Sequence, residues 1–84
     1  MKYYNDIDFI LKEVTGFLDK EVINEAQEYI ENNEYTIAFE LICEVLTRYA
    51  IVIPQRLYEK IQKVGIFLKL DPKKWVSIKT NLPK

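Results

Sequence analysis

The stretch "ENNEYTIAFELICEVLTRYA", Glu31 to Ala50, decides the fold that we expect for this chain. It is apolar around most of a helical circumference, and its polar residues are confined to a narrow strip. A helix with so wide an apolar arc is usually packed on two or more sides. The sequence therefore predicts a helix over residues 34–49 at the centre of a small bundle, with Cys43 as a small buried side chain.

Helical periodicity also extends through the segments before this central helix, where apolar residues recur at i, i+3, i+4 and i+7. Asn5 and Asp19 are suitable N-caps for two earlier helices. Gly16 should end the first of them, because glycine adopts the left-handed conformation without a steric penalty. Asn32-Asn33 should end the second, because asparagine tolerates the same conformation.

The segment after the central helix carries its own boundary signals. "AIVIP", Ala50 to Pro54, interrupts the helical pattern and predicts an extended connection. Gly65 lies on the apolar face of the next helix, which indicates close contact with another helix. In "LDPKKWVSI", Asp71 is a cap for a fifth helix, anchored by Trp75 and Ile78. The sequence thus predicts an all-α fold, a bundle of four to five helices in a single domain over residues 1–84, with helices at about 6–15, 20–32, 34–49, 54–68 and 72–80.

The composition is that of a globular chain with one modest core: 84 residues, of which 49% are hydrophobic and 30% charged. A single cysteine cannot form an internal disulfide, and the sequence shows no signal peptide and no apolar run of membrane-spanning length. We therefore expect a cytoplasmic protein. The net charge of −1 hides an asymmetry, because residues 1–47 hold eleven acidic and three basic residues, whereas residues 48–84 hold two acidic and nine basic ones.

Catalysis is not indicated by the residue types present. The chain has no histidine, so the usual general base and the commonest metal ligand are missing, and Cys43 has no histidine partner to activate it. Phosphate-cradling, calcium-binding and paired-cysteine motifs are also missing. We expect no enzyme activity, no cofactor and no bound metal.

The charged surfaces leave several functions open. Acidic residues of the second helix and its ends can form a strip of one sign that docks on a basic protein, although most such residues simply face solvent. The Lys-rich second half favours an alternative, a small nucleic-acid-binding regulator that uses Arg56 and the lysines at 60, 63, 69, 73 and 74. A helical adaptor for an unrelated protein is a third reading.

Three segments, "NNEYTIAFELICEVL", "IVIPQRLYEKIQKVG" and "LDPKKW", resemble the MafI family of bacterial immunity proteins and the small helical immunity proteins of contact-dependent growth-inhibition systems. The similarity spans about residues 17–76, and it departs from the family pattern at Asn33, where glycine is usual. It is carried by Glu34-Tyr35, Ala38, Glu40, Ile42, Cys43, Glu44, Ile51, Ile53, Pro54, Leu57, Tyr58, Ile61, Leu70, Asp71, Pro72 and Trp75.

The resemblance implies a function. Such proteins bind the C-terminal toxic domain of a secreted or surface-displayed protein, often a nuclease and in some cases an EndoU-like RNase, and neutralise it. We expect a 1:1 complex in which an acidic surface covers the active site or an adjacent surface. The predicted toxin interface consists of Asp19, Glu21, Glu25, Glu28, Glu31, Glu34, Glu40 and Tyr58. Tyr3 and Tyr4 are further candidates for an aromatic anchor.

Overall fold

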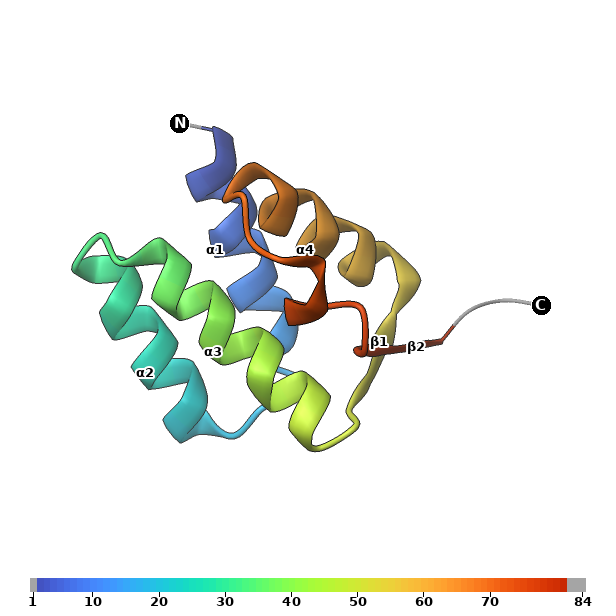
Figure 1. The fold of residues 1–84 in the computed structure, drawn as a ribbon. Coiled ribbons are helices and arrows are strands. Elements are labelled where there is room, and N and C mark those ends of the chain that lie inside the picture. The colour runs from blue at the N-terminus through green and yellow to red at the C-terminus, as the bar shows by residue number, and fades with distance from the viewer. Residues whose placement is uncertain (1, 82–84) are drawn as a thin grey trace.

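Residues 2–81 form four α-helices and a small two-stranded parallel sheet (Figure 1). A computed structural model describes the backbone of residues 2–81 and the side chains of residues 6–81. The elements in chain order are α1 (Lys2–Val14), α2 (Lys20–Glu31), α3 (Tyr35–Arg48), β1 (Val52–Pro54), α4 (Gln55–Phe67), the 3-10 turn η1 (Pro72–Lys74) and β2 (Lys79–Asn81).

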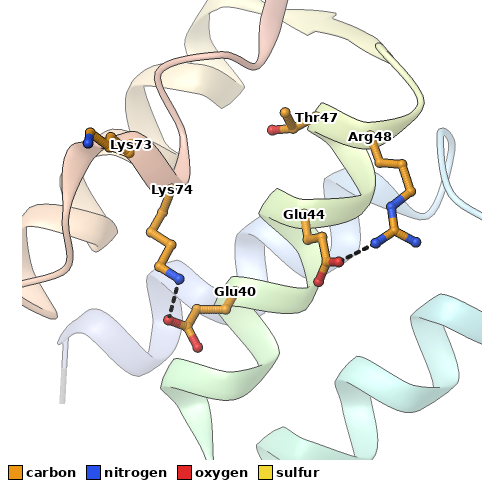
Figure 2. Close-up of a pocket in the computed structure, with 6 residues that line it drawn as sticks. All are labelled: Glu40, Glu44, Thr47, Arg48, Lys73 and Lys74. Atoms are coloured by element: carbon orange, nitrogen blue, oxygen red, sulfur yellow. Dashed lines mark hydrogen bonds and ion pairs between the residues drawn. The ribbon is translucent and has the colours of Figure 1, made fainter.

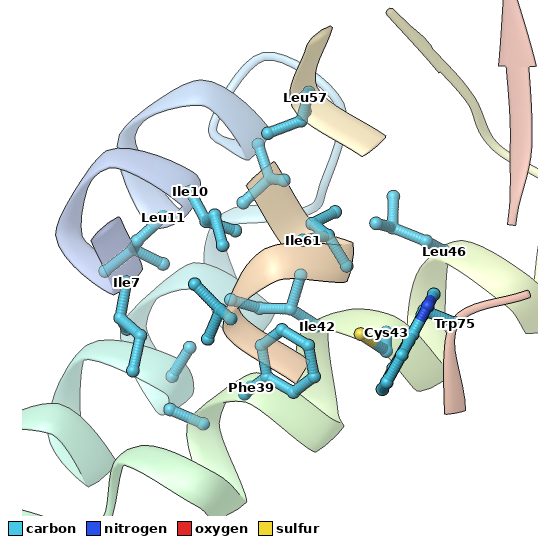
Figure 3. Close-up of a cluster of buried hydrophobic side chains, with 14 of the residues drawn as sticks. Ile7, Ile10, Leu11, Phe39, Ile42, Cys43, Leu46, Leu57, Ile61 and Trp75 are labelled. Atoms are coloured by element: carbon cyan, nitrogen blue, oxygen red, sulfur yellow. The ribbon is translucent and has the colours of Figure 1, made fainter. Parts of the chain in front are cut away.

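The helices pack as two pairs, because α2 lies against α3 and α1 lies against α4. In Figure 1, α2 is at the lower left and α4 at the upper right, with α1 and α3 between them. Helix α3 packs against α1, α2 and η1, as expected for a helix covered on several sides, but α1 is the helix that contacts all three others. The buried side chains of α3 are Ala38, Phe39, Ile42, Cys43 and Leu46, and they join apolar residues of every other helix in one core (Figure 3).

Helix ends follow the sequence signals in part. Asn33 has a φ of 63° directly after α2, as predicted, and Asp19 precedes the first turn of α2, although its side chain makes no capping hydrogen bond. Two expectations are wrong. Asn5 lies inside α1, which already begins at Lys2, and Gly16 does not have a positive φ. An N-cap contributes only about 0.5–2 kcal/mol, so neighbouring residues of adequate helix propensity can extend a helix past it.

The expectation of a purely all-α fold is corrected at the end of the chain. The predicted fifth helix over residues 72–80 is a single 3-10 turn, η1, followed by β2. Asp71 does cap this turn, since its side chain accepts a hydrogen bond from the Lys73 backbone N–H at 3.0 Å. β2 then pairs in parallel with β1, so that Ile53 lies beside Thr80. Branched residues around Ile78 favour this extended backbone over a continued helix.

Gly65 makes the close approach that its position predicted, but its neighbour is Trp75 and not another helix. A Cβ built at Gly65 would lie 2.5 Å from Cε3 and 2.7 Å from Cη2 of the indole. The indole also meets Phe39 edge-on, with ring centroids 6.3 Å apart, and only 1% of Trp75 is exposed. The indole thereby fixes η1 against both α3 and α4.

Candidate functional site

Folding brings the acidic and basic halves of the chain together. Four ion pairs are formed among the side chains of residues 6–81, and each joins a carboxylate of the first half to a cation of the second half. They are Arg48–Glu44 at 2.6 Å, Arg56–Glu13 at 3.4 Å, Lys60–Asp6 at 3.3 Å and Lys74–Glu40 at 3.3 Å. Much of the charge asymmetry seen along the sequence is therefore neutralised within the fold.

The carboxylates that remain outside these ion pairs are concentrated on one element. Seven carboxylates of the first half take part in none of the ion pairs formed in the described part of the chain, and six of the seven lie on α2 or at its ends. All six are exposed. We call these residues the α2 acidic face: Asp19, Glu21, Glu25, Glu28, Glu31 and Glu34.

Helix geometry explains why this face has one sign. Glu21, Glu25 and Glu28 are four and three residues apart, so their side chains emerge within a narrow sector of α2. Ala26, on the opposite side, is completely buried. Lys20 is the only basic residue in α2.

Local helix energetics do not account for the α2 acidic face. Like charges three or four residues apart oppose helix formation by about 0.2–0.5 kcal/mol per pair. Glu28 and Glu31 also lie in the last turn, where the helix dipole disfavours negative charge. Burial of the apolar side of α2 against α3 maintains the helix despite this repulsion.

The two other predicted interface residues are placed differently. Glu40 is on α3, where its carboxylate holds Lys74, and it reaches the edge of the surface formed by α2 and α3. Tyr58 is on α4, half-buried against the core, and α4 lies on the far side of the molecule from α2 (Figure 1). The structure therefore does not bring Tyr58 together with the α2 acidic face. The side chains of Tyr3 and Tyr4 lie outside the described residues.

A groove of about 300 Å³ runs between α2 and α3, and sequence reasoning missed it. We call it the α2/α3 groove, and its lining residues are Glu25, Tyr29, Ile37, Glu40, Leu41 and Glu44. Ile37 adds to the apolar arc of α3, yet 42% of it is exposed. The spacing of residues 37, 40, 41 and 44, which lie on one helical stripe, was the available signal.

A second depression, of about 400 Å³, lies between α3 and η1 (Figure 2). Its lining residues are Glu40, Glu44, Thr47, Arg48, Lys73 and Lys74. Figure 2 shows that its charges largely satisfy one another, because Lys74 binds Glu40 and Arg48 binds Glu44 across or along its edge. Two of its three cations are thus neutralised, and Lys73 carries the one positive charge left over among the lining residues.

Of the six basic residues named for nucleic-acid binding, Arg56, Lys60 and Lys74 are held by carboxylates, whereas Lys63, Lys69 and Lys73 form no ion pair among the side chains of residues 6–81. Lys60 binds Asp6 and also lies 5.4 Å from the ring centroid of Phe9, and Arg56 and Lys74 are held by carboxylates. Carboxylates this close to the cations repel phosphate and reduce the electrostatic gain of nucleic-acid binding. This geometry disfavours nucleic-acid binding through Arg56, Lys60 and Lys74.

Cys43 is a core side chain, as predicted, with 1% of its surface exposed (Figure 3). Burial, and to a smaller extent the charge of Glu40, raises the pKa of its thiol to about 12. A thiol with so high a pKa is protonated at neutral pH and is a poor nucleophile. Among the residues that the structure describes, no group of three or more acidic or cysteine side chains is arranged to hold a metal ion.

Comparisons with known protein families, with characterised proteins and with solved structures gave no significant match. The resemblance to the MafI immunity proteins thus stays a prediction. No helix in the described part of the chain has both the length and the apolar composition needed to cross a bilayer.

Proposed function

We propose that this protein is an immunity protein that binds the nuclease domain of a cognate bacterial toxin in a 1:1 complex and neutralises it in the cytoplasm. The observation that supports the proposal is the α2 acidic face, which keeps six exposed carboxylates outside the ion pairs that neutralise other charges of this fold. A nuclease must hold a polyanion, so its substrate cleft is basic. An acidic helix can cover such a cleft, or a surface beside it, and exclude RNA or DNA.

The packing of α2 against α3 favours tight binding. Helix α2 packs against α3, and Ala26, on the inner side of α2, is fully buried. A preformed surface loses little conformational entropy when it binds. The field of like charges on it would also accelerate encounter with a basic partner. The resemblance to immunity proteins adds the expectation that the partner is a toxin domain, with an EndoU-like RNase as one class.

The proposal is tested by capturing partners from the native bacterium with tagged protein and identifying them by mass spectrometry. The test variant reverses two charges of the α2 acidic face, Glu21→Lys with Glu28→Lys. The matched control reverses two exposed carboxylates on other helices, Asp8→Lys with Glu59→Lys. All four positions are exposed, so both variants should fold.

The expected partner is a basic domain from a large secreted protein. It should be retained by the wild-type protein and the control but bound at least about tenfold more weakly by the test variant, a loss of about 1.4 kcal/mol. The captured domain should degrade RNA or DNA, and adding wild-type protein should stop it. Equal binding by both variants would contradict an acidic interface. Recovery of nucleic acid that is lost on reversing Lys63 and Lys73 would instead support the nucleic-acid regulator.

A further inference from the structure

The α2/α3 groove adds a feature that a flat acidic surface would not have. Each helix contributes one stripe to it, with Glu25 and Tyr29 four residues apart on α2 and the stripe from Ile37 to Glu44 on α3. Its lining is mixed, because Tyr29, Ile37 and Leu41 contribute apolar surface and three glutamates contribute carboxylates. It is continuous with the α2 acidic face because Glu25 belongs to both.

The charges of the groove select the chemistry of its occupant. Glu25 forms no ion pair within residues 6–81, whereas Glu40 and Glu44 already hold Lys74 and Arg48. A purely apolar side chain would cover Ile37 but would also strip water from Glu25 without giving it a partner, which is unfavourable. The occupant must therefore combine an apolar body with a positive end.

Arginine meets this requirement better than lysine. Its planar guanidinium is weakly hydrated, stacks on aromatic rings and forms two parallel hydrogen bonds to a carboxylate. The ammonium of lysine is a compact and strongly hydrated charge that gains little from an aromatic or aliphatic wall. Tyr29 supplies such a wall, and Glu25, one helical turn away, supplies the carboxylate.

We propose that the α2/α3 groove receives an arginine side chain of the basic partner, with the arginine stem on Ile37 and Leu41 and its guanidinium at Tyr29 and Glu25. The inference rests on the proposed function, since it names the residue type by which the α2 acidic face would recognise its partner. The α2/α3 groove would then select arginine over lysine, while the rest of the α2 acidic face would attract the basic partner by charge alone.

The test measures binding of two labelled probes with the same charge, hexa-arginine and hexa-lysine peptides, by fluorescence anisotropy at one salt concentration. The groove variant is Ile37→Gln, which removes apolar surface without changing the charge. Ile66→Gln is its matched control, because Ile66 is an exposed isoleucine on α4, away from the groove. The charge-reversed variant Glu21→Lys with Glu28→Lys is measured alongside, and sedimentation gives the oligomeric state.

We expect wild-type protein and Ile66→Gln to bind the arginine peptide at least about threefold more tightly than the lysine peptide. In Ile37→Gln this preference should disappear, while binding of the lysine peptide should be unchanged. An arginine preference that survives in Ile37→Gln, or is missing in the wild-type protein, would overturn the groove inference.

The remaining outcomes separate the groove from the proposed function. If both peptides bind the charge-reversed variant as tightly as the wild type, the α2 acidic face is not the binding surface and the proposed function loses its support. If charge reversal weakens binding but the arginine preference is missing or survives in Ile37→Gln, the acidic interface is supported and the groove inference is overturned. A wild-type dimer that Ile37→Gln dissociates would mean that a second copy of this chain covers the groove, which would also overturn the inference.

Discussion

Substituting Gly65 by alanine should destabilise this protein, although the same change usually stabilises a helix. Alanine is favoured over glycine inside a helix by about 1 kcal/mol. At Gly65, however, the added Cβ would lie within 2.7 Å of three indole atoms of Trp75. The indole cannot easily retreat, because only 1% of Trp75 is exposed and its ring meets Phe39 edge-on.

The magnitude follows from these opposing effects. Overpacking a core costs about 1–3 kcal/mol, and complete loss of the Trp75 contacts would approach the roughly 3–5 kcal/mol of a Trp-to-Ala substitution. After about 1 kcal/mol of helix propensity is subtracted, these ranges become about 0–2 and about 2–4 kcal/mol, so we expect the free energy of unfolding of Gly65→Ala to fall by about 2 kcal/mol, where the two ranges meet. The melting temperature should fall by about 4–8 °C for each kcal/mol in a domain of this size.

The assay is urea unfolding followed by far-ultraviolet circular dichroism, which does not depend on the environment of the single tryptophan. Gly16→Ala is the matched control, since a Cβ at Gly16 meets nothing within 4 Å and its φ is not positive. The control should be as stable as the wild type or more stable, by up to about 1 kcal/mol. Equal stabilities of the two alanine variants would refute the argument that the Trp75 contact requires a glycine.

Three further predictions concern the thiol, an ion pair and salt. Burial raises the pKa of Cys43 from its ordinary value near 9 to about 12, so the thiol should resist alkylation in the native state. Because this folded pKa exceeds the unfolded one, wild-type stability should fall between about pH 9 and pH 12 more than that of Cys43→Ala does. In double-mutant cycles, the half-buried pair Lys60–Asp6 should show a larger coupling energy than the exposed pair Arg48–Glu44, for which about 0.3–0.5 kcal/mol is typical; equal couplings would contradict this. Binding of the basic partner should weaken when sodium chloride is raised from about 0.05 M to about 0.5 M, and salt-independent binding would argue against an acidic interface.

The sequence by itself determined the helices that have strong local signals. The predicted bounds of α2, α3 and α4 agree with the structure within one residue at each end. Helical periodicity and the stop at Asn33 depend on residues a few positions apart, so these features can be read without knowing the rest of the fold. The burial of Cys43 and Trp75 follows from the same patterns.

The tertiary structure alone decided the features that join distant residues. The pairing of β2 with β1 replaced a predicted helix, because Thr80 lies beside Ile53 only after the intervening helix has folded back. Tertiary packing also decided that Lys74 neutralises Glu40 and that Tyr58 lies apart from the α2 acidic face. Local periodicity assigns a residue to a side of its own helix, but the packing of one helix on another decides whether that side is covered. For this reason the sequence predicted the acidic residues of α2, whereas only the fold showed which of them stay outside the ion pairs of residues 6–81 and that Ile37 lines a groove beside them.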